Sequence, residues 1–285
     1  MIELQQTGAH ALLWTFAGDA LNCAAAVAAA HPSAEVEHLT GLGDDEHSAG
    51  LRDFCTALDV DASRSPVLPG KSLGLYWITT EDGDRRFTYW RNDSAARQLF
   101  RSNEMVLFGP TPDLVIISGI TLAVAGPAAP QLLDQIEQAS TAGAKIAYDT
   151  NHRPLLCPDI EAARAHAERA LSLADIVHAS ADDLDELWGG DTTLDSWPQT
   201  FGITELIVTD GDRPVRVLSN GSEARAQPDP VPVVDTAGAG DAFFGTYVGH
   251  RLAELPTMEA LARALEVSSE VVQSPGALTY LIDPA

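Results

Sequence analysis

The stretch Val234-Asp-Thr-Ala-Gly-Ala-Gly-Asp241-Ala-Phe-Phe-Gly245 decides the predicted fold, because it joins two kinds of secondary structure through a loop of small residues. Before it, the valines at 231, 233 and 234 are typical of the end of a β-strand. After it, residues 242–252 form an apolar run that favours a helix. Residues 237–240 are two alanines and two glycines, which let successive backbone N–H groups turn toward one point. That point lies at a helix N-terminus, where free amides and the helix dipole favour an anion.

Asp241 follows this loop directly, in the first turn of the predicted helix. A carboxylate beside an anion site is unfavourable unless it takes a proton, and a hydroxyl that attacks a phosphoryl group supplies that proton. The alternative interpretation of Asp241 is a helix cap without chemistry. A Walker loop is excluded because it needs Gly-Lys-Ser/Thr, and lysine occurs only at Lys71 and Lys145. A dinucleotide fingerprint is excluded because it stands near the start of a βαβ unit and carries no such carboxylate.

The composition limits what the chain can bind. Its 285 residues include 41 acidic and 17 basic side chains, a formal net charge of −24, and 45% are hydrophobic. This charge argues against nucleic acid and membranes as partners, so that an anionic substrate would depend on local arginines. Cys23, Cys55 and Cys157 lie far apart without metal-ligand spacing, which predicts reduced thiols in a cytoplasmic protein. We expect no signal peptide and no membrane span, since no basic leader or long apolar run is present.

The remaining pattern alternates strands and helices. The predicted strands are 36–42, 114–117, 145–148, 176–177 and 205–208, and the predicted helices are 19–31, 46–58, 131–142, 162–173, 181–188 and 258–273. Repeated units of this kind with right-handed crossovers predict a doubly wound, mostly parallel sheet with helices on both faces. Asp149-Thr-Asn-His-Arg153 follows a predicted strand, and the carboxyl ends of such strands are where ligands bind in open α/β sheets.

A β-hairpin is predicted at 75–80 and 85–91, around the turn Asp82-Gly83. A twisted pair of this size cannot bury both faces, so we expect it to cover a site as a lid. Tyr89 and Arg91 are two residues apart and share a face, which suits an anionic, hydroxylated ligand. The alternative for the aromatic residues of this hairpin is cross-strand packing, which we favour for Trp90.

The segment Asp235-Thr-Ala-Gly-Ala-Gly-Asp241 resembles the C-terminal signature of the ribokinase/PfkB family of sugar kinases. The resemblance implies that Asp241 is the general base and that Gly238, Ala239 and Gly240 form the anion hole. It also implies ATP and Mg²⁺, and it leaves a K⁺ requirement open. Gly18-Asp-Ala-Leu-Asn22 is similar to the sugar-binding entry of that family, which implies that Asp19 and Asn22 hold substrate hydroxyls.

Further motifs occur in the family's order and are most similar to its bacterial members that phosphorylate 2-keto-3-deoxygluconate. These motifs are Tyr89-Trp-Arg91-Asn92, Ser118-Gly-Ile-Thr121, Asp149-x-Asn151-x-Arg153-Pro154, Leu187-Trp-Gly189 and Gly276-Ala277. The resemblance implies one ribokinase-like domain over 1–285, with lid strands near 8–17 and 68–92, and a homodimer. The implied sugar-acid ligands are Gly18, Asp19, Asn22, Tyr76, Tyr89, Arg91 and Arg153. The implied nucleotide ligands are Asn151, Ser180, Thr209, Gly211, Ala237, Gly238 and Gly240, with Asp183 acting on the metal through water.

The chain departs from this family pattern in three places. Met1-Ile-Glu-Leu4 is similar to the end of the family's opening strand, so we expect the natural protein to begin about one strand earlier. Ser180-x-x-Asp183 replaces Asn-x-x-Glu, and Thr209-Asp-Gly-Asp-Arg-Pro214 replaces a loop richer in glycine. Two arginines in the pocket suit a substrate carboxylate, although Arg153 could instead form a surface ion pair or contact ATP. A fructokinase-like enzyme and a non-catalytic sugar- or nucleotide-binding protein remain as alternatives.

Overall fold

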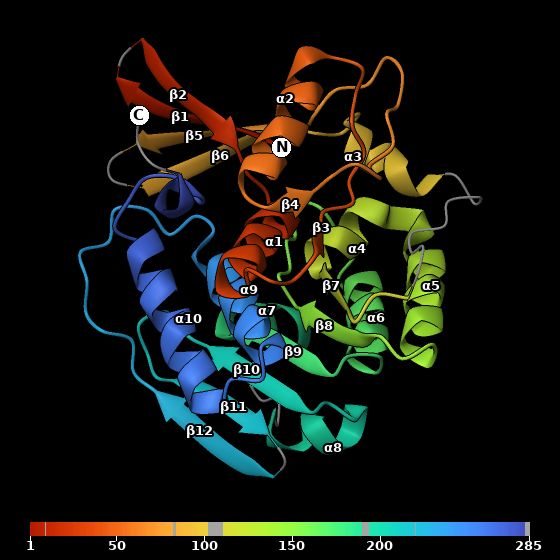
Figure 1. Cartoon of the computed structure of the whole chain (residues 1–285), viewed down its shortest axis with the longest axis vertical. Coiled ribbons are helices and arrows are strands. Elements are labelled where there is room, and N and C mark those ends of the chain that lie inside the picture. Colours follow the sequence, from red (N-terminus) through yellow and green to blue (C-terminus); the bar gives the residue numbers. More distant parts are fainter. Residues whose placement is uncertain (9, 82–83, 102–110, 190–193, 220, 283–285) are drawn as a thin grey trace. The chain divides into compact units, whose positions relative to one another are not determined.

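A computed structural model describes residues 1–8, 10–81, 84–101, 111–189, 194–219 and 221–282 (Figure 1). The chain divides into two compact units. The first unit consists of Met1–Ser102, Val231–Ala253 and Val267–Ala285, and the second of Asn103–Pro230 and Glu254–Glu266. That the two units together make one ribokinase-like domain stays a prediction.

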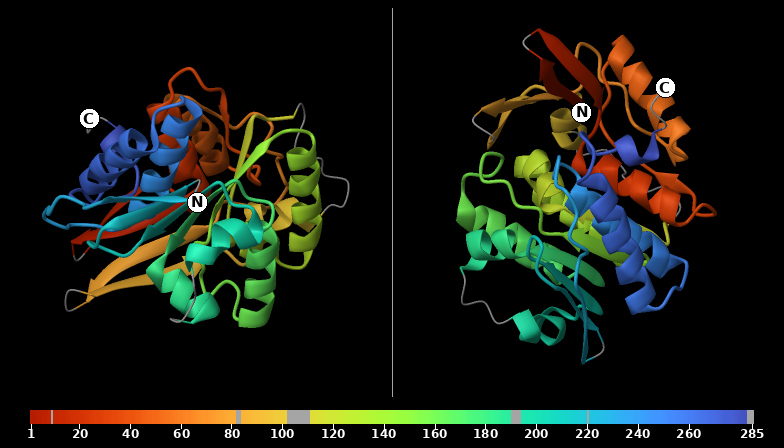
Figure 2. Two further views of the ribbon diagram at one scale, coloured as in Figure 1. Left: turned by 90° about the horizontal axis from the view of Figure 1, so that it is seen from below. Right: turned by 90° about the vertical axis from the view of Figure 1, so that its left-hand side faces the viewer.

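The first unit contains a four-stranded sheet in the order β2-β1-β5-β6. Its strands are β1 (Ile2–Gly8), β2 (Ala11–Phe16), β5 (Leu75–Glu81) and β6 (Asp84–Trp90). Strand β1 runs parallel to β5, while the pairs β1–β2 and β5–β6 are antiparallel. In Figure 2 the first of these antiparallel pairs is red and the second is orange. The predicted hairpin is therefore confirmed, and its turn residues Asp82 and Gly83 lie outside the described residues. Trp90 lies opposite Leu75 in register and is 55% exposed, and its cross-strand packing stays a prediction.

Two helices of the first unit pack at unusually short range. These are α1 (Asp19–Ala30) and α9 (Ala239–Leu252), which lie side by side in Figure 1. Helix α1 presents alanines, and α9 presents Gly245 and Gly249, which lie four residues apart on one face. A Cβ atom at Gly245 would lie 2.4 Å from the carbonyl oxygen of Cys23, and one at Gly249 would lie 2.9 Å from Cβ of Ala30. The backbones can approach this closely only because the side chains between them are small.

The rest of the first unit encloses a core that contains Phe16, Leu21, Leu42, Leu51 and Leu278. Helix α2 (Glu46–Ala57) begins at Asp45, whose carboxylate accepts from the backbone N–H of Ser48 at 2.8 Å, as an N-cap does. The short strands β3 (Val36–Glu37) and β4 (Val60–Asp61) pair in parallel. The strand predicted over 36–42 is therefore limited to its first two residues. The short helix α3 (Ala95–Gln98) follows β6, and α10 (Thr257–Val271) runs through parts of both units.

The second unit is built on a six-stranded sheet in the order β12-β11-β10-β9-β8-β7. Its parallel strands are β7 (Leu114–Ser118), β8 (Lys145–Asp149), β9 (Ile176–Ser180) and β10 (Glu205–Thr209). The last three are almost continuously buried, as expected for parallel strands covered on both faces. The helices of this unit are α4 (Gly119–Ala125), α5 (Ala129–Thr141), α6 (Ile160–Leu171), α7 (Ala181–Trp188) and α8 (Trp197–Phe201). The alternating pattern predicted for this part of the chain is confirmed.

The strand predicted at 231–234 is wrong. These residues form no strand, and Val233 and Val234 are 64% and 54% exposed. Pro228, Pro230 and Pro232 precede and interrupt the valines, and proline has no N–H to donate to a sheet. The sheet instead ends in the antiparallel strands β11 (Val215–Ser219) and β12 (Ser222–Ala226), which the pattern did not predict. No helix within the described ranges is long and apolar enough to cross a membrane.

The close packing of α1 and α9 can be tested by adding one methyl group. Gly245→Ala should lower the free energy of unfolding by about 1–3 kcal/mol, because the new Cβ meets backbone atoms that cannot rotate away. The matched control is Gly50→Ala in α2, where the new Cβ would meet Phe16 at 3.4 Å, an ordinary contact. That control should be stabilised by about 0.5–1 kcal/mol, the usual gain of alanine over glycine in a helix. Urea unfolding measures both, and equal effects would contradict the packing argument.

Candidate active site

The loop before α9 has the backbone that an anion site at a helix N-terminus needs. Gly238 is the N-cap of α9 and has φ of 75°, in the left-handed region that favours glycine. A Cβ at this position would also lie 2.4 Å from Cβ of Ala277, so two independent constraints require glycine. Ala239, Gly240 and Asp241 form the first turn of α9, and the N–H groups of a first turn have no acceptor within the helix. The predicted helix N-terminus is therefore present.

Asp241 is held by a residue of α1. The side-chain amide nitrogen of Asn22 donates to Oδ2 of Asp241 at 2.8 Å. The amide oxygen of Asn22 accepts from the backbone N–H of Gly18 at 3.3 Å. Asn22 is 4% exposed, so both ends of its amide are fixed in a nearly dry environment. The structure thus brings Gly18 and Asn22 of one segment together with Asp241, which is 219 residues from Asn22 in sequence, and it orients the predicted base.

Asp235 anchors the same loop and was not predicted as a functional residue. Its side chain is 1% exposed and accepts from two backbone N–H groups, those of Ala237 at 2.7 Å and Gly276 at 2.9 Å. These bonds tie the small-residue loop to the segment at Gly276. The sequence carried a signal for this role, because an aspartate two residues before the small-residue run can form an Asx-type turn with it.

The four-stranded sheet (the lid sheet) carries the predicted sugar-acid ligands Tyr76 on β5 and Tyr89 on β6, and Arg91 follows directly after β6. Tyr76 opposes Tyr89 in register, and their ring centroids are 6.0 Å apart. The guanidinium carbon of Arg91 lies 3.9 Å from the centre of the Tyr89 ring, a cation–π contact. The hydroxyl of Tyr76 donates to Glu3, and burial together with this carboxylate raises the pKa of the phenol. Tyr76 therefore stays a hydrogen-bond donor over the physiological pH range.

In the second unit, one side chain from each of β8, β9 and β10 takes part in a chain of hydrogen bonds. Nδ1 of His178 lies 2.9 Å from Oδ1 of Asp149, and its Nε2 lies 3.0 Å from Oγ1 of Thr209. Asp149 and His178 are both buried. The sequence analysis had predicted Thr209 as a nucleotide ligand but missed its two partners. The available signal was a histidine in an otherwise apolar strand.

Asp183, the predicted metal ligand, is used to hold the chain after β8. Its Oδ2 accepts from the hydroxyl of Thr150 at 2.7 Å and its Oδ1 from the backbone N–H of His152 at 3.0 Å. Asn151 between them has φ of 28°, an unusual value for a residue other than glycine. Ser180 caps α7 by accepting from the backbone N–H of Asp183. The structure thus places Asp183 and Ser180 in hydrogen bonds with other residues of the protein. Their contacts to metal and nucleotide remain predictions.

The fit of a magnesium ion is limited by these contacts. Among the residues that the structure describes, no group of three or more histidine, cysteine, aspartate or glutamate side chains could hold a metal. Mg²⁺ usually binds through one or two carboxylates and substrate phosphates while it keeps several waters. A single carboxylate such as Asp183 fits this mode of Mg²⁺ binding. A preformed site made of protein ligands alone would not match it.

Asp19, Arg153 and Gly211 were also predicted as ligands. Asp19 lies in the first turn of α1, beside Gly18, whose φ is 139°. Arg153 is about half exposed, with its guanidinium 3.9 Å from Asp183, and it donates to the carbonyl of His152. Gly211 has φ of 56°, in a turn after β10. The ion pair considered for Arg153 is thus present, at the long limit of such contacts.

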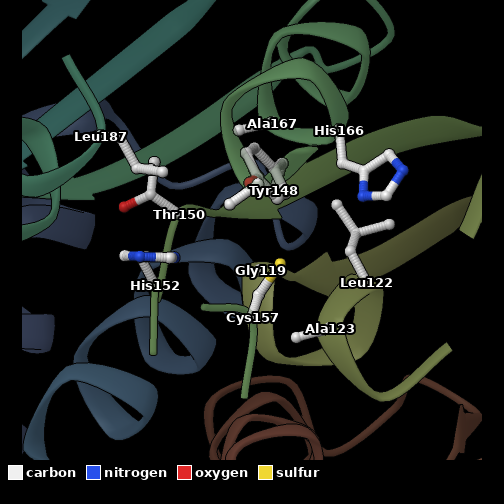
Figure 3. Close-up of a pocket in the computed structure, with 11 residues that line it drawn as sticks. Gly119, Leu122, Ala123, Tyr148, Thr150, His152, Cys157, His166, Ala167 and Leu187 are labelled. Atoms are coloured by element: carbon white, nitrogen blue, oxygen red, sulfur yellow. The ribbon is translucent and has the colours of Figure 1, made fainter. Parts of the chain in front are cut away.

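The described part of the second unit contains pockets that differ greatly in size. The first has a volume of about 20 Å³, room for about one water, and is lined by Tyr148, Thr150, His152, Cys157 and His166 among others (Figure 3). Burial raises the pKa of the Cys157 thiol, which argues against a reactive thiolate there. The second, of about 450 Å³, is lined by Arg213, Arg216 and Arg225 among others, and these arginines are paired with carboxylates. Neither pocket carries the chemistry of the Asp241 loop.

The family description "pfkB family carbohydrate kinase" matches residues 8–283. The 2-dehydro-3-deoxygluconokinase of Escherichia coli (strain K12) is 31% identical over 98% of this chain and 94% of that protein. Probable fructokinase-4 of Arabidopsis thaliana is 30% identical over 84% of this chain and 74% of its own length. The solved structure of fructokinase from Vibrio cholerae O395 with fructose, ADP and calcium superposes with a TM-score of 0.84 at 23% identity, covering 99% and 93% of the two chains. The predicted ribokinase-like α/β fold class is confirmed by this likeness.

The structural role of Asp183 predicts an effect that needs no metal. Asp183→Asn should lower the free energy of unfolding by about 1–3 kcal/mol, because one buried donor loses its acceptor. The control is Asp182→Asn, since Asp182 is an exposed neighbour in the same first helical turn. Urea unfolding in the presence of EDTA measures both variants. An equal and small effect of the two changes would mean that the bonds to Thr150 and His152 do not stabilise the fold.

Proposed function

The chain belongs to the pfkB family of carbohydrate kinases, and from this premise we propose that it transfers the terminal phosphoryl group of ATP to 2-keto-3-deoxygluconate. The product would be the 6-phosphate of this sugar acid. The observation that carries the proposal is the pair Asn22–Asp241 beside the N-terminus of α9. A positioned carboxylate next to a helix N-terminus is what phosphoryl transfer to a hydroxyl needs.

In the proposed reaction, Asp241 takes the proton from the terminal hydroxyl of the sugar. The hydrogen bond from Asn22 holds the carboxylate in place, so little reorganisation is needed when the hydroxyl approaches. Of the loop residues 237–240, Gly238 and Gly240 are proposed to turn their backbone N–H groups to the transferring phosphoryl group, because those of Ala237 and Ala239 donate to Asp235 and Thr236. Asp183 is the residue that would hold Mg²⁺, through water, and the ion would supply positive charge that offsets part of the charge of the ATP phosphates.

The proposed substrate is an acid because of the residues on the lid sheet. Arg91 stacks on Tyr89, and we propose that its planar guanidinium pairs with the substrate carboxylate. Arg153 is proposed as a second contact to the sugar acid, and Gly18, Asp19 and Tyr76 as contacts to its hydroxyls. On a protein with a formal charge of −24, these short contacts have to overcome long-range repulsion of the substrate.

Nucleotide contacts are proposed for Asn151, Ser180, Thr209, Gly211, Ala237, Gly238 and Gly240. A K⁺ requirement and assembly as a homodimer are also retained as proposals. The described cysteines are free, which is compatible with the proposed cytoplasmic location. A fructokinase-like activity is the alternative that a substrate comparison must test, and a protein without kinase activity is the other. A coupled ADP-release assay over sugars and sugar acids separates the three possibilities.

The role of Asp241 can be tested by Asp241→Asn, which keeps the size of the side chain and removes the base. We expect kcat to fall by about two to four orders of magnitude, the usual contribution of a general base. The melting temperature should change little, because the oxygen of the new amide can still accept from Asn22. Asp182→Asn is a suitable control for the loss of a first-turn carboxylate. A variant with more than about a tenth of the native turnover would be incompatible with a catalytic base at this position.

Arg91 can be tested as the residue that recognises the acid. Arg91→Leu should lower kcat/KM for 2-keto-3-deoxygluconate about ten- to a hundredfold, the effect of losing a charged hydrogen bond. The value for fructose, which has no carboxylate, should change much less. Arg86→Leu is the control, because Arg86 is an exposed residue of β6, the strand that ends one residue before Arg91. Equal losses for both substrates would assign Arg91 to the lid, and a native enzyme that prefers fructose would refute the sugar-acid proposal.

A further inference from the structure

The side chain of Gln5 bridges two buried carboxylates. Gln5 lies on β1 and is 9% exposed. Its Nε2 donates to Oε1 of Glu3 at 2.9 Å and to Oδ2 of Asp235 at 3.0 Å. A primary amide nitrogen carries two protons, and each of them has an acceptor here. Glu3 and Asp235 are both 1% exposed, so little water is available to replace these bonds.

Each of the two carboxylates leads to a different part of the proposed active site. Glu3 accepts from the hydroxyl of Tyr76, a proposed contact to the sugar acid. Asp235 accepts from the backbone N–H groups of Ala237 and Gly276, and Ala237 belongs to the loop proposed to stabilise the phosphoryl group. The chain of bonds Tyr76–Glu3–Gln5–Asp235–Ala237 therefore connects the lid sheet to the loop before α9 without interruption.

We propose that Gln5 is a positioning residue that couples the sugar-facing sheet to the phosphoryl-binding loop. It contacts no substrate in this proposal and acts through Glu3 and Asp235. This inference rests on the proposed kinase function, but the hydrogen-bond chain itself can be measured without any substrate. Sequence reasoning did not identify Gln5, because a single glutamine within a strand has no distinctive pattern.

The amide of Gln5 also reduces the electrostatic repulsion between two carboxylates. Glu3 and Asp235 each place an oxygen within hydrogen-bond distance of the same nitrogen, so the two carboxylates are close neighbours. Acidic side chains in such proximity repel one another when both are ionised, and the penalty rises with burial. Two amide protons between them offset part of that repulsion. Removal of the amide should therefore displace one carboxylate, and with it either Tyr76 or the loop at Ala237.

The test is Gln5→Met, which keeps the length of the side chain and removes both donors. Gln6→Met is the matched control, since Gln6 is an exposed residue of the same strand whose amide donates only to the nearby carbonyl of Gly8. We expect amide hydrogen exchange at Ala237 and Gly276 to become about tenfold faster in Gln5→Met, the effect of losing a hydrogen bond to a charged group. The exchange rates of the α2 amides in the same unit should not change. In Gln6→Met, the exchange rates should change neither in α2 nor at Ala237 and Gly276.

The kinetic readout is kcat/KM for 2-keto-3-deoxygluconate, which should fall about tenfold or more in Gln5→Met because the loop amides lose their orientation. In a double-mutant cycle with Asp235→Asn, the loss in the double variant should be smaller than the product of the two single losses. Should Gln5→Met not fold, Gln5→Asn shortens the same side chain and allows the same measurements.

Three results are decisive. Unchanged exchange at Ala237 and Gly276 would overturn the coupling, as would multiplicative losses in the cycle. Exchange that rises equally in α2 would reduce Gln5 to a general stabilising residue and would also overturn the proposal. A native protein that phosphorylates no sugar acid would refute the proposed function alone, and the exchange experiment would still test the connection through Gln5.

Discussion

The contact between α1 and α9 is the constraint on which the proposed base depends. Asn22 meets Asp241 at the start of the two helices, and Gly245 and Gly249 meet the small residues of α1 one and two turns further along. Successive contacts lie further toward the C-terminus in both helices, so the two helices run parallel. Larger side chains at the glycines would separate the axes, and the 2.8 Å bond between Asn22 and Asp241 could not form.

A parallel pair places both helix N-termini at the same end. The backbone N–H groups at the start of α1 and of α9 therefore contribute partial positive charge to one region, which also contains Gly18 and Gly238. This matters in a protein with 41 acidic and 17 basic side chains, because most of its surface repels anions. Fixed backbone dipoles at this end of the helices, together with Arg91, provide positive potential without additional lysine side chains. The small residues that allow close packing thus also allow anion binding.

The sequence contained enough to predict the α/β class, the hairpin, most helices and the loop before Asp241. These features depend on local patterns, such as the small residues at 237–240 or the alternating aromatic residues of β5 and β6. It was misleading at 231–234, where the valines resemble a strand but the flanking prolines prevent pairing. The sequence did not indicate the roles of Gln5 and His178. The role of a buried polar residue depends on hydrogen-bond partners in distant segments, which no local sequence pattern identifies.

The bond between His178 and Thr209 limits what Thr209 can offer a ligand. Asp149 in its ionised form can only accept, so Nδ1 of His178 carries the proton of that bond. With a neutral ring, Nε2 is an acceptor and the hydroxyl proton of Thr209 points to it. The lone pairs of Thr209 then face away from the histidine, toward donors. If Thr209 contacts the nucleotide as proposed, a sugar hydroxyl or a metal-bound water suits it better than a phosphate oxygen, which has no proton to give. Phosphate recognition is then left to the amides at the start of α9, where the donors are.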